Sequence, residues 1–87
     1  ILNRYWDDTP TPRPEAYRQE IALTSEANLT DAQARIMYEH IRAACESGWD
    51  FSSRWFADGH SMATIQTAYR VPVDLNCLLY ELEFMLY

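Results

Sequence analysis

The stretch TDAQARIMYEHIRAACESG, residues 30–48, carries the clearest helix signals of the chain. Thr30 and Gln33 match a capping box, in which each side chain binds a free backbone N–H group at the start of a helix. Gly48 lies at the end of this stretch, and glycine is common where a helix ends in the left-handed conformation. The apolar stripe between these signals recurs at spacings of three and four residues, and its members are Ala34, Met37, Ile41, Ala44 and Cys45.

A shorter helix is expected before this one. Pro14 is suited to the first position of a helix, because its fixed φ matches the helix and its missing N–H is not needed there. Tyr17, Ile21 and Ala22 are expected to form the apolar side of this helix, which fades near residues 25–28.

A third helix is expected after Pro72, with Asp74 as its N-cap. Leucines line one face of this segment, and the apolar pattern is still running at Tyr87. The pattern therefore predicts an apolar face that this chain alone does not cover, and a chain that is part of a longer one. The leucines of this face are Leu75, Leu78, Leu79, Leu82 and Leu86.

The remaining segments have no clear helical period. Prolines at positions 10 and 12 disfavour helix in the residues before them, so residues 1–12 are expected to be extended or looped. Residues 51–71 are expected to be irregular, and the part from 62 to 71, MATIQTAYRV, is compatible with a short strand or a coil. The predicted fold class is therefore all-α.

The composition is that of a small folded protein with an acidic balance. The chain has 87 residues, of which 48% are hydrophobic, and a formal net charge of −6. An acidic chain repels a phosphate backbone, so no nucleic-acid partner is expected. No apolar run is long enough to span a bilayer, so no membrane partner is expected either. Cys45 and Cys77 can pair or stay reduced, and their number leaves the cellular compartment open.

The segment ESGWDFSSRWF, residues 46–56, places Asp50 among aromatic residues just beyond the long helix. Loops on rigid helices often display catalytic groups. If the rings enclose the carboxyl, burial disfavours its charged form and preserves the proton that a general acid donates, whereas a nearby Arg54 acts in the opposite direction. The alternative is that Asp50 caps the next turn and the aromatic residues belong to the core. The rings are those of Trp49, Phe51, Trp55 and Phe56.

Three blocks of the chain together resemble segments of trehalases, the inverting glycosidases that split α,α-trehalose into two glucose molecules. The first block is the segment at 46–56, and its order and rough spacing relative to the other two also agree with that family. The other blocks are YWDDTPTPRPEAY at 5–17 and VPVDLNCLLYELE at 71–83. The resemblance covers nearly the whole chain.

The resemblance implies roles for particular residues. Asp50 would be the general acid that protonates the glycosidic oxygen, and Gly48 would lie against the substrate, where a side chain would obstruct the sugar. Arg13 and Glu15 would hydrogen-bond sugar hydroxyls as donor and acceptor, and Pro14 would fix the backbone between them. Without the resemblance, this Arg-Pro-Glu run is simply an exposed helix start.

The resemblance also implies that the second catalytic carboxylate lies outside this chain. An inverting glycosidase needs a base roughly 6.5–9.5 Å from the acid. In trehalases the base belongs to a Gly-rich segment, whereas this chain has two glycines. The family fold is an (α/α)6 barrel, of which residues 1–87 would be a single incomplete helical-hairpin segment. The isolated chain is therefore expected to be inactive, with trehalose and the remainder of the catalytic domain as its partners.

Other functions are less well supported by the sequence. No cofactor is expected, and no metal site is expected because Asp58, His60 and His40 lack the paired spacing of metal ligands. Two alternatives stay open. One is a non-catalytic helical module that binds a partner helix through its apolar faces. The other is a segment of a different (α/α)-barrel glycosidase, such as a glucoamylase-like enzyme.

Overall fold

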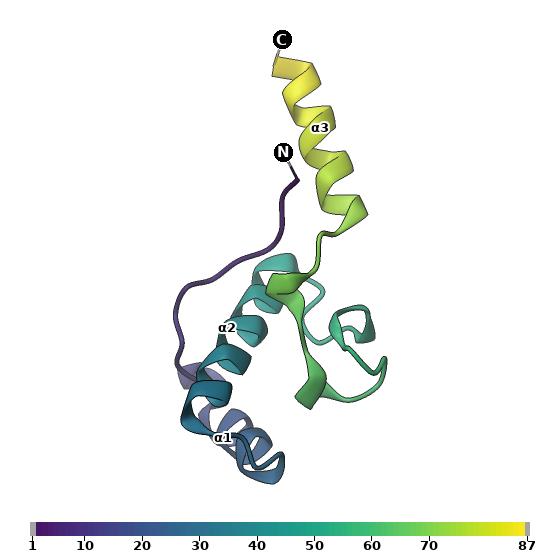
Figure 1. Cartoon of the computed structure of the whole chain (residues 1–87). Coiled ribbons are helices and arrows are strands. Elements are labelled where there is room, and N and C mark those ends of the chain that lie inside the picture. Colours follow the sequence, from purple (N-terminus) through teal and green to yellow (C-terminus); the bar gives the residue numbers. More distant parts are fainter. Residues whose placement is uncertain (1, 87) are drawn as a thin grey trace.

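The computed structural model describes residues 2–86, and the regular elements of this region are all helical (Figure 1). No strand longer than a single bridge pair occurs within it, so the predicted all-α class is confirmed. None of these helices has the length and apolar character of a membrane span. The α-helices are α1 (Tyr17–Glu26), α2 (Asp31–Ser47) and α3 (Val73–Leu86). The 3-10 turns are η1 (Pro14–Ala16), η2 (Ser53–Trp55), η3 (Met62–Thr64) and η4 (Thr67–Tyr69).

The long helix α2 begins and ends where the sequence predicted. The Thr30 hydroxyl accepts a bond from the Gln33 N–H at 3.2 Å, and the Gln33 side chain accepts one from the Thr30 N–H at 3.0 Å. At the other end Gly48 has a φ of 75°, a left-handed conformation that costs other residues about 1–2 kcal/mol. The buried members of the predicted apolar stripe are Met37, Ile41 and Ala44.

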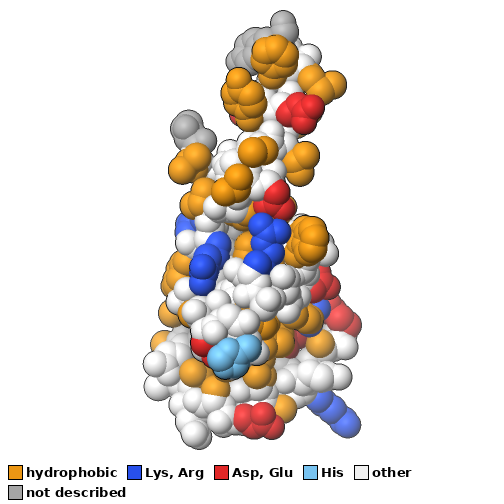
Figure 2. Space-filling view, turned by 90° about the vertical axis from the view of Figure 1, so that its right-hand side faces the viewer, with side chains coloured by type: hydrophobic (Ala, Val, Ile, Leu, Met, Phe, Trp, Pro, Cys, Tyr) orange, Lys and Arg blue, Asp and Glu red, His pale blue; other side chains and the backbone are white. Residues whose placement is uncertain are grey.

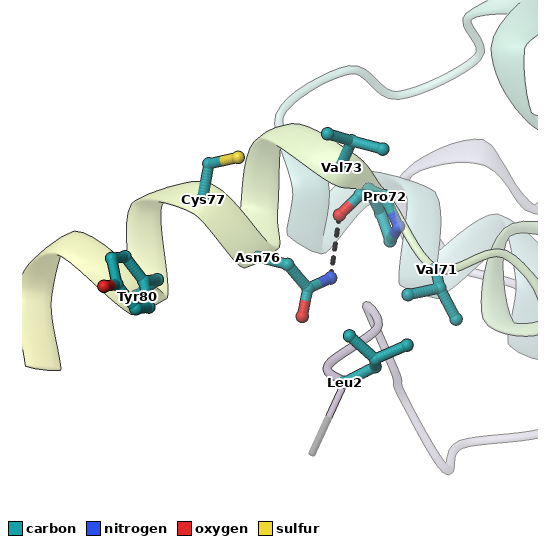
Figure 3. Close-up of a pocket in the computed structure, with 7 residues that line it drawn as sticks. All are labelled: Leu2, Val71, Pro72, Val73, Asn76, Cys77 and Tyr80. Atoms are coloured by element: carbon teal, nitrogen blue, oxygen red, sulfur yellow. Dashed lines mark hydrogen bonds between the residues drawn. The ribbon is translucent and has the colours of Figure 1, made fainter.

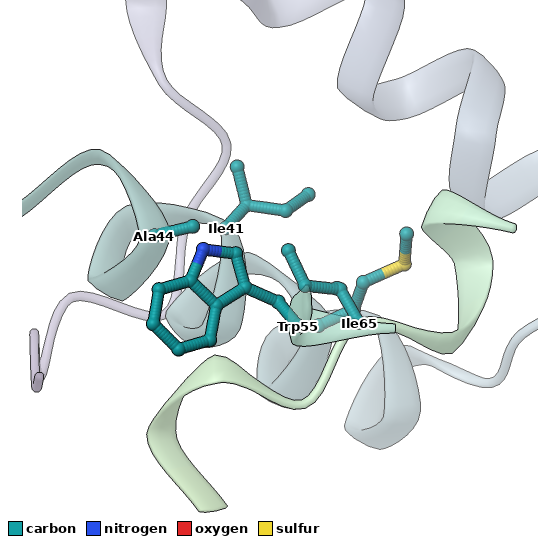
Figure 4. Close-up of a cluster of buried hydrophobic side chains, with 5 residues drawn as sticks. Ile41, Ala44, Trp55 and Ile65 are labelled. Atoms are coloured by element: carbon teal, nitrogen blue, oxygen red, sulfur yellow. The ribbon is translucent and has the colours of Figure 1, made fainter. Parts of the chain in front are cut away.

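The hydrophobic core lies between α2 and the irregular segment that follows it (Figure 4). Trp55 and Ile65 pack against α2, where Trp55 is 1% exposed and Ile41 is fully buried. The Trp55 indole N–H donates to the Trp49 carbonyl at 3.1 Å, so burying this large ring leaves its polar atom paired. This packing anchors the turn at residues 49–52 to a rigid core.

Residues 51–71 form a series of 3-10 turns rather than a strand or a featureless coil. A single antiparallel bridge joins Phe56 to Ile65, and the Gln66 N–H donates to the Trp55 carbonyl at 2.7 Å. These bonds join the two ends of a loop. Because they link residues that are far apart in the sequence, the local pattern gave no indication of them.

The apolar side predicted for α1 is wrong. Tyr17 and Ile21 are 56% and 37% exposed and Ala22 is exposed, whereas the buried side chains are Glu20 and Thr24. The buried face of α1 is held by polar contacts: the threonine hydroxyl bonds a tyrosine hydroxyl of α2, and the glutamate pairs with the arginine before η1. Since an unpaired buried charge is costly, the ion pair allows Glu20 to lie on the buried face of α1.

Helix α3 projects away from the rest of the molecule (Figure 1). It begins at Val73, so Asp74 lies in its first turn and is not the predicted N-cap; its carboxylate binds Arg54 instead. None of the described α3 residues is buried, and apolar side chains cover much of this helix in Figure 2. The prediction of an uncovered apolar face is confirmed. Its most exposed leucines are Leu78, Leu82 and Leu86, at 63%, 52% and 77%.

An open apolar pocket of about 520 Å³ lies between the start of α3 and the N-terminal segment (Figure 3). Asn76 holds the two together, because its amide donates to the Asn3 carbonyl at 2.8 Å and its oxygen accepts from the Asn3 N–H at 2.7 Å. Cys77 lines the pocket and is a free thiol, as is Cys45. Apolar lining comes from Leu2, Val71, Pro72, Val73 and Tyr80.

Candidate active site

The turn that follows α2 displays Asp50 at the surface. Gly48 takes the chain out of the helix, and its N–H donates to the Cys45 carbonyl at 3.3 Å. The Ser52 N–H donates to the Trp49 carbonyl at 3.0 Å, which closes a turn that contains Asp50. A Cβ atom added at Gly48 would meet no atom within 4 Å, so within this chain the backbone conformation, not space, requires glycine.

The aromatic residues do not enclose the Asp50 carboxyl within residues 2–86. Asp50 is exposed, and its neighbours Trp49 and Phe51 are 57% and 39% exposed. Trp55 is buried, but it belongs to the core. Within residues 2–86, the rings on either side of the acid are therefore exposed to solvent along with it.

Arg54 is bound to a different carboxylate. Its Nη2 and Nη1 atoms donate to the two oxygens of Asp74 at 3.0 and 3.1 Å. Its guanidinium carbon also lies 5.6 Å from the Trp49 ring centroid. The Arg54 bond lowers the pKa of Asp74. Within the described region, no ion pair joins Arg54 to Asp50, so the opposing cation considered from the sequence is engaged elsewhere.

Arg13 is held by three different groups. Its Nε donates to Oε2 of Glu20 at 3.0 Å, and its backbone N–H donates to Oε1 at 3.3 Å. Its Nη1 donates to the Cys45 sulfur at 3.1 Å, and its guanidinium carbon lies 5.0 Å from the Phe51 ring centroid. Because Phe51 follows Asp50 directly, these contacts bring the start of η1 beside the turn that carries the acid.

The pKa of the Cys45 thiol is affected by burial and by charged groups of the η1 segment and of the turn that follows α2. Burial raises its pKa and the Arg13 guanidinium lowers it, while the nearby carboxylates raise it further. The contacts of Arg13 with the Cys45 sulfur and the Phe51 ring show that the structure brings the two segments into one region. The carboxylates are those of Asp50, Glu20 and Glu15.

Pro14 and Glu15 open η1 at the surface. Pro14 occupies the first position of the turn, which its fixed φ favours. The Glu15 side chain is 69% exposed and lies 3.9 Å from the Arg13 guanidinium, so its carboxylate is accessible to a hydroxyl. Arg42 of α2 holds the preceding backbone by donating to the Thr11 carbonyl at 2.7 Å.

No cluster of three or more His, Cys, Asp or Glu side chains suited to a metal ion occurs within residues 2–86. Asp58 accepts the backbone N–H groups of His60 and the next residue at 2.9 and 2.7 Å, and so stabilises a turn. His40 is buried elsewhere, where its Nδ1 accepts the Ala68 N–H at 3.1 Å.

Sequence reasoning missed the residues that support Arg13. Cys45 was counted in the apolar stripe but not as a hydrogen-bond acceptor. Glu20 lies seven residues after Arg13, and the chain changes from a 3-10 turn to an α-helix between them. The available signal was the four-residue spacing of Glu20 and Thr24, which places both on one helix face without showing that this face is buried.

Comparison with known proteins identifies the family. The Trehalase family model matches residues 1–87, so the chain belongs to the trehalase family. It is 52% identical over 83 residues to the periplasmic trehalase of Xanthomonas campestris pv. campestris (strain B100), which is 95% of this chain and 14% of that protein. It is 52% identical over 86 residues to the periplasmic trehalase of Citrobacter koseri, which is 99% of this chain and 15% of that protein.

Proposed function

We propose that this chain forms part of the catalytic domain of an enzyme that hydrolyses α,α-trehalose to two glucose molecules with inversion. The observation that supports this most directly is the placement of Arg13 beside the turn that carries Asp50, in a chain of the trehalase family. The chain spans 14% of the length of a periplasmic trehalase, so the other catalytic groups would come from the remainder of such a domain.

In the proposed reaction Asp50 is the general acid. Its carboxyl proton passes to the glycosidic oxygen as the C–O bond breaks, so the leaving glucose departs as a neutral alcohol. A base outside this chain removes a proton from a water molecule that attacks the opposite face of the sugar, which inverts the anomeric centre. One water molecule is consumed and each product is a free glucose.

The sugar site would be completed by residues of the two segments that Arg13 brings together, the start of η1 and the turn that follows α2. Arg13 donates to sugar hydroxyls and Glu15 accepts from them, while Pro14 fixes the backbone between the two. Gly48 lies against the sugar. A methyl group there meets no protein atom within 4 Å, which is compatible with the space above it being substrate space.

The exposed surfaces of this chain support a covering partner. Asp50 is open to solvent and α3 presents apolar side chains along its length. Packing of the remaining catalytic domain on these surfaces would bury apolar area and remove water from the acid. We propose that this packing completes a helical (α/α)6 barrel, to which residues 1–87 contribute one helical-hairpin segment.

Replacing Asp50 by Asn in the full-length enzyme tests the assignment. Glucose release from trehalose should fall at least about a hundredfold, the lower range for loss of a general acid. Glu46→Gln is the matched control, since Glu46 is an exposed carboxylate near the same helix end, and this variant should retain activity. Full activity in the Asp50→Asn variant would contradict the proposal.

The isolated chain should release no glucose from trehalose, because it lacks the base. Activity should return when flanking segments of the domain, supplied as separate chains, assemble with it. Turnover by the isolated chain that Asp50→Asn abolishes would show that the base lies within these residues. A folded but inactive complex would argue against Asp50 as the acid.

The exposed apolar face of α3 also supports a second candidate, a non-catalytic module that binds a partner helix. In that case partner binding would survive the Asp50→Asn substitution, and the full-length protein would not hydrolyse trehalose. Substrate profiling of the full-length protein separates these outcomes, and it also tests the preference for trehalose over other glucosides.

A further inference from the structure

A buried carboxylate lies directly behind the proposed sugar-binding arginine. The Glu20 side chain is only 2% exposed, and both of its oxygens accept bonds from Arg13, one from the backbone N–H and one from Nε. A carboxylate that holds the backbone and the side chain of one residue restricts both its position and its orientation. Glu20 itself is too deeply buried to reach a sugar from the surface.

The remaining contacts of Arg13 show which part of its guanidinium is left for a ligand. Nε is bound to Glu20, and Nη1 donates to the Cys45 sulfur at 3.1 Å. Within residues 2–86, Nη2 has no hydrogen-bond acceptor. The Phe51 ring lies 5.0 Å from the guanidinium carbon and further restricts the group.

We infer that Glu20 is a positioning residue, which holds the Arg13 guanidinium so that its Nη2 edge is presented to a sugar hydroxyl. This inference rests on the proposed function, because it needs Arg13 to contact the substrate. An arginine side chain otherwise samples many rotamers, and fixing it before the substrate binds removes that entropic cost from binding. Glu20 therefore acts on substrate affinity without touching the substrate.

Glu20→Gln is the direct test, measured in the full-length enzyme. The amide has nearly the same shape, but it carries no charge, and its NH₂ group cannot accept the second of the two Arg13 bonds. With Arg13 released, the KM for trehalose should rise about tenfold, in line with the loss of one charge-assisted hydrogen bond.

Thr24→Val is the matched control. Thr24 lies four residues later on the same buried face of α1, and its hydroxyl bonds Tyr38 at 3.2 Å rather than Arg13. A substitution that only loosens α1 lowers stability or the amount of active enzyme, and so lowers kcat at constant KM. Thr24→Val should therefore leave KM unchanged, while Glu20→Gln raises it.

An Arg13→Ala background tests whether Glu20 acts through Arg13. In this background Glu20→Gln should raise KM no further. An unchanged KM in Glu20→Gln, or a further rise in the Arg13→Ala background, would overturn the inference. If Glu20→Gln does not fold, Glu20→Asp keeps the charge one methylene shorter, and its KM should lie between those of wild type and Arg13→Ala; a wild-type KM would overturn it.

The same measurements distinguish a failure of this inference from a failure of the proposed function. Wild-type enzyme that does not release glucose from trehalose would overturn the proposed function and the inference with it. Wild-type activity together with a wild-type KM in Glu20→Gln would overturn only the role of Glu20.

Discussion

Replacing Gly48 by Ala should damage activity more than the cost in stability explains. Gly48 has a φ of 75°, so alanine there costs about 1–2 kcal/mol of backbone strain. A Cβ atom added at this position meets no protein atom within 4 Å, so no steric clash within the chain adds to the strain energy. If the proposed contact with sugar is correct, the methyl group occupies substrate space, and one misplaced methyl group changes kcat/KM by roughly 10- to 200-fold.

Gly59→Ala is a closely matched control for this prediction. Gly59 has a φ of 81°, and an added Cβ there also meets nothing within 4 Å. Both alanine variants should therefore lose a similar free energy of unfolding, measured in urea. In the full-length enzyme, trehalose hydrolysis should fall about tenfold or more in Gly48→Ala and remain near wild type in Gly59→Ala.

Gly48→Asn separates backbone strain from steric obstruction. Asparagine adopts the left-handed conformation more readily than alanine but has a larger side chain. Stability should therefore fall in the order wild type, Asn, Ala, whereas activity should fall in the order wild type, Ala, Asn. Equal activities for Gly48→Ala and Gly59→Ala, or an activity order that follows stability, would refute the placement of substrate against Gly48.

Three further predictions concern stability. Thr67→Val should raise the free energy of unfolding by about 1 kcal/mol, because the buried Thr67 hydroxyl has no hydrogen-bond partner within residues 2–86. A lower free energy of unfolding in this variant would show that the hydroxyl forms a hydrogen bond. Thr30→Ala should cost about 1 kcal/mol through the lost helix cap, and Thr30→Ser should cost much less; equal losses would argue against the cap. Burial, and then the charge of Arg4, lowers the pKa of His40 below its ordinary 6.5. The folded state therefore favours the neutral imidazole, and the contribution of this group to the free energy of unfolding is fully present above pH 6.5 and is lost as the pH falls. His40→Asn should weaken this dependence between pH 7 and 5, and an unchanged pH profile would exclude His40 as its source.

The sequence predicted α2 well because its determinants are local. The capping box at Thr30, the stripe through Ile41 and the left-handed Gly48 lie within a single helix and need no knowledge of the rest of the chain. The prediction of an uncovered apolar face on α3 succeeded for the same reason. The start of α3 was misplaced by two residues, because the helix begins at Val73 and Asp74 lies in its first turn, where its carboxylate binds Arg54.

The failures arose where tertiary contacts outweigh the local pattern. Counting apolar residues favoured Tyr17 and Ile21 as the inner side of α1, but Glu20 lies on the buried side, paired with an arginine outside the helix. The 51–71 segment is ordered by bonds that return to α2, such as the one from Ala68 to a buried histidine. Neither effect has a signature in a short window of sequence.

The site residues were placed by resemblance rather than by local chemistry, and the structure shows how the two arginines beside the proposed acid, Asp50, are engaged. A general acid must keep its proton, and a cation bound to it would favour the charged form instead. Two arginines contact the aromatic residues on either side of Asp50, yet each is committed to another carboxylate. Arg13 is bound to the buried Glu20 and Arg54 is bound through two atoms to Asp74. Within residues 2–86, therefore, both positive charges lie beside the proposed site and neither forms an ion pair with the Asp50 carboxyl.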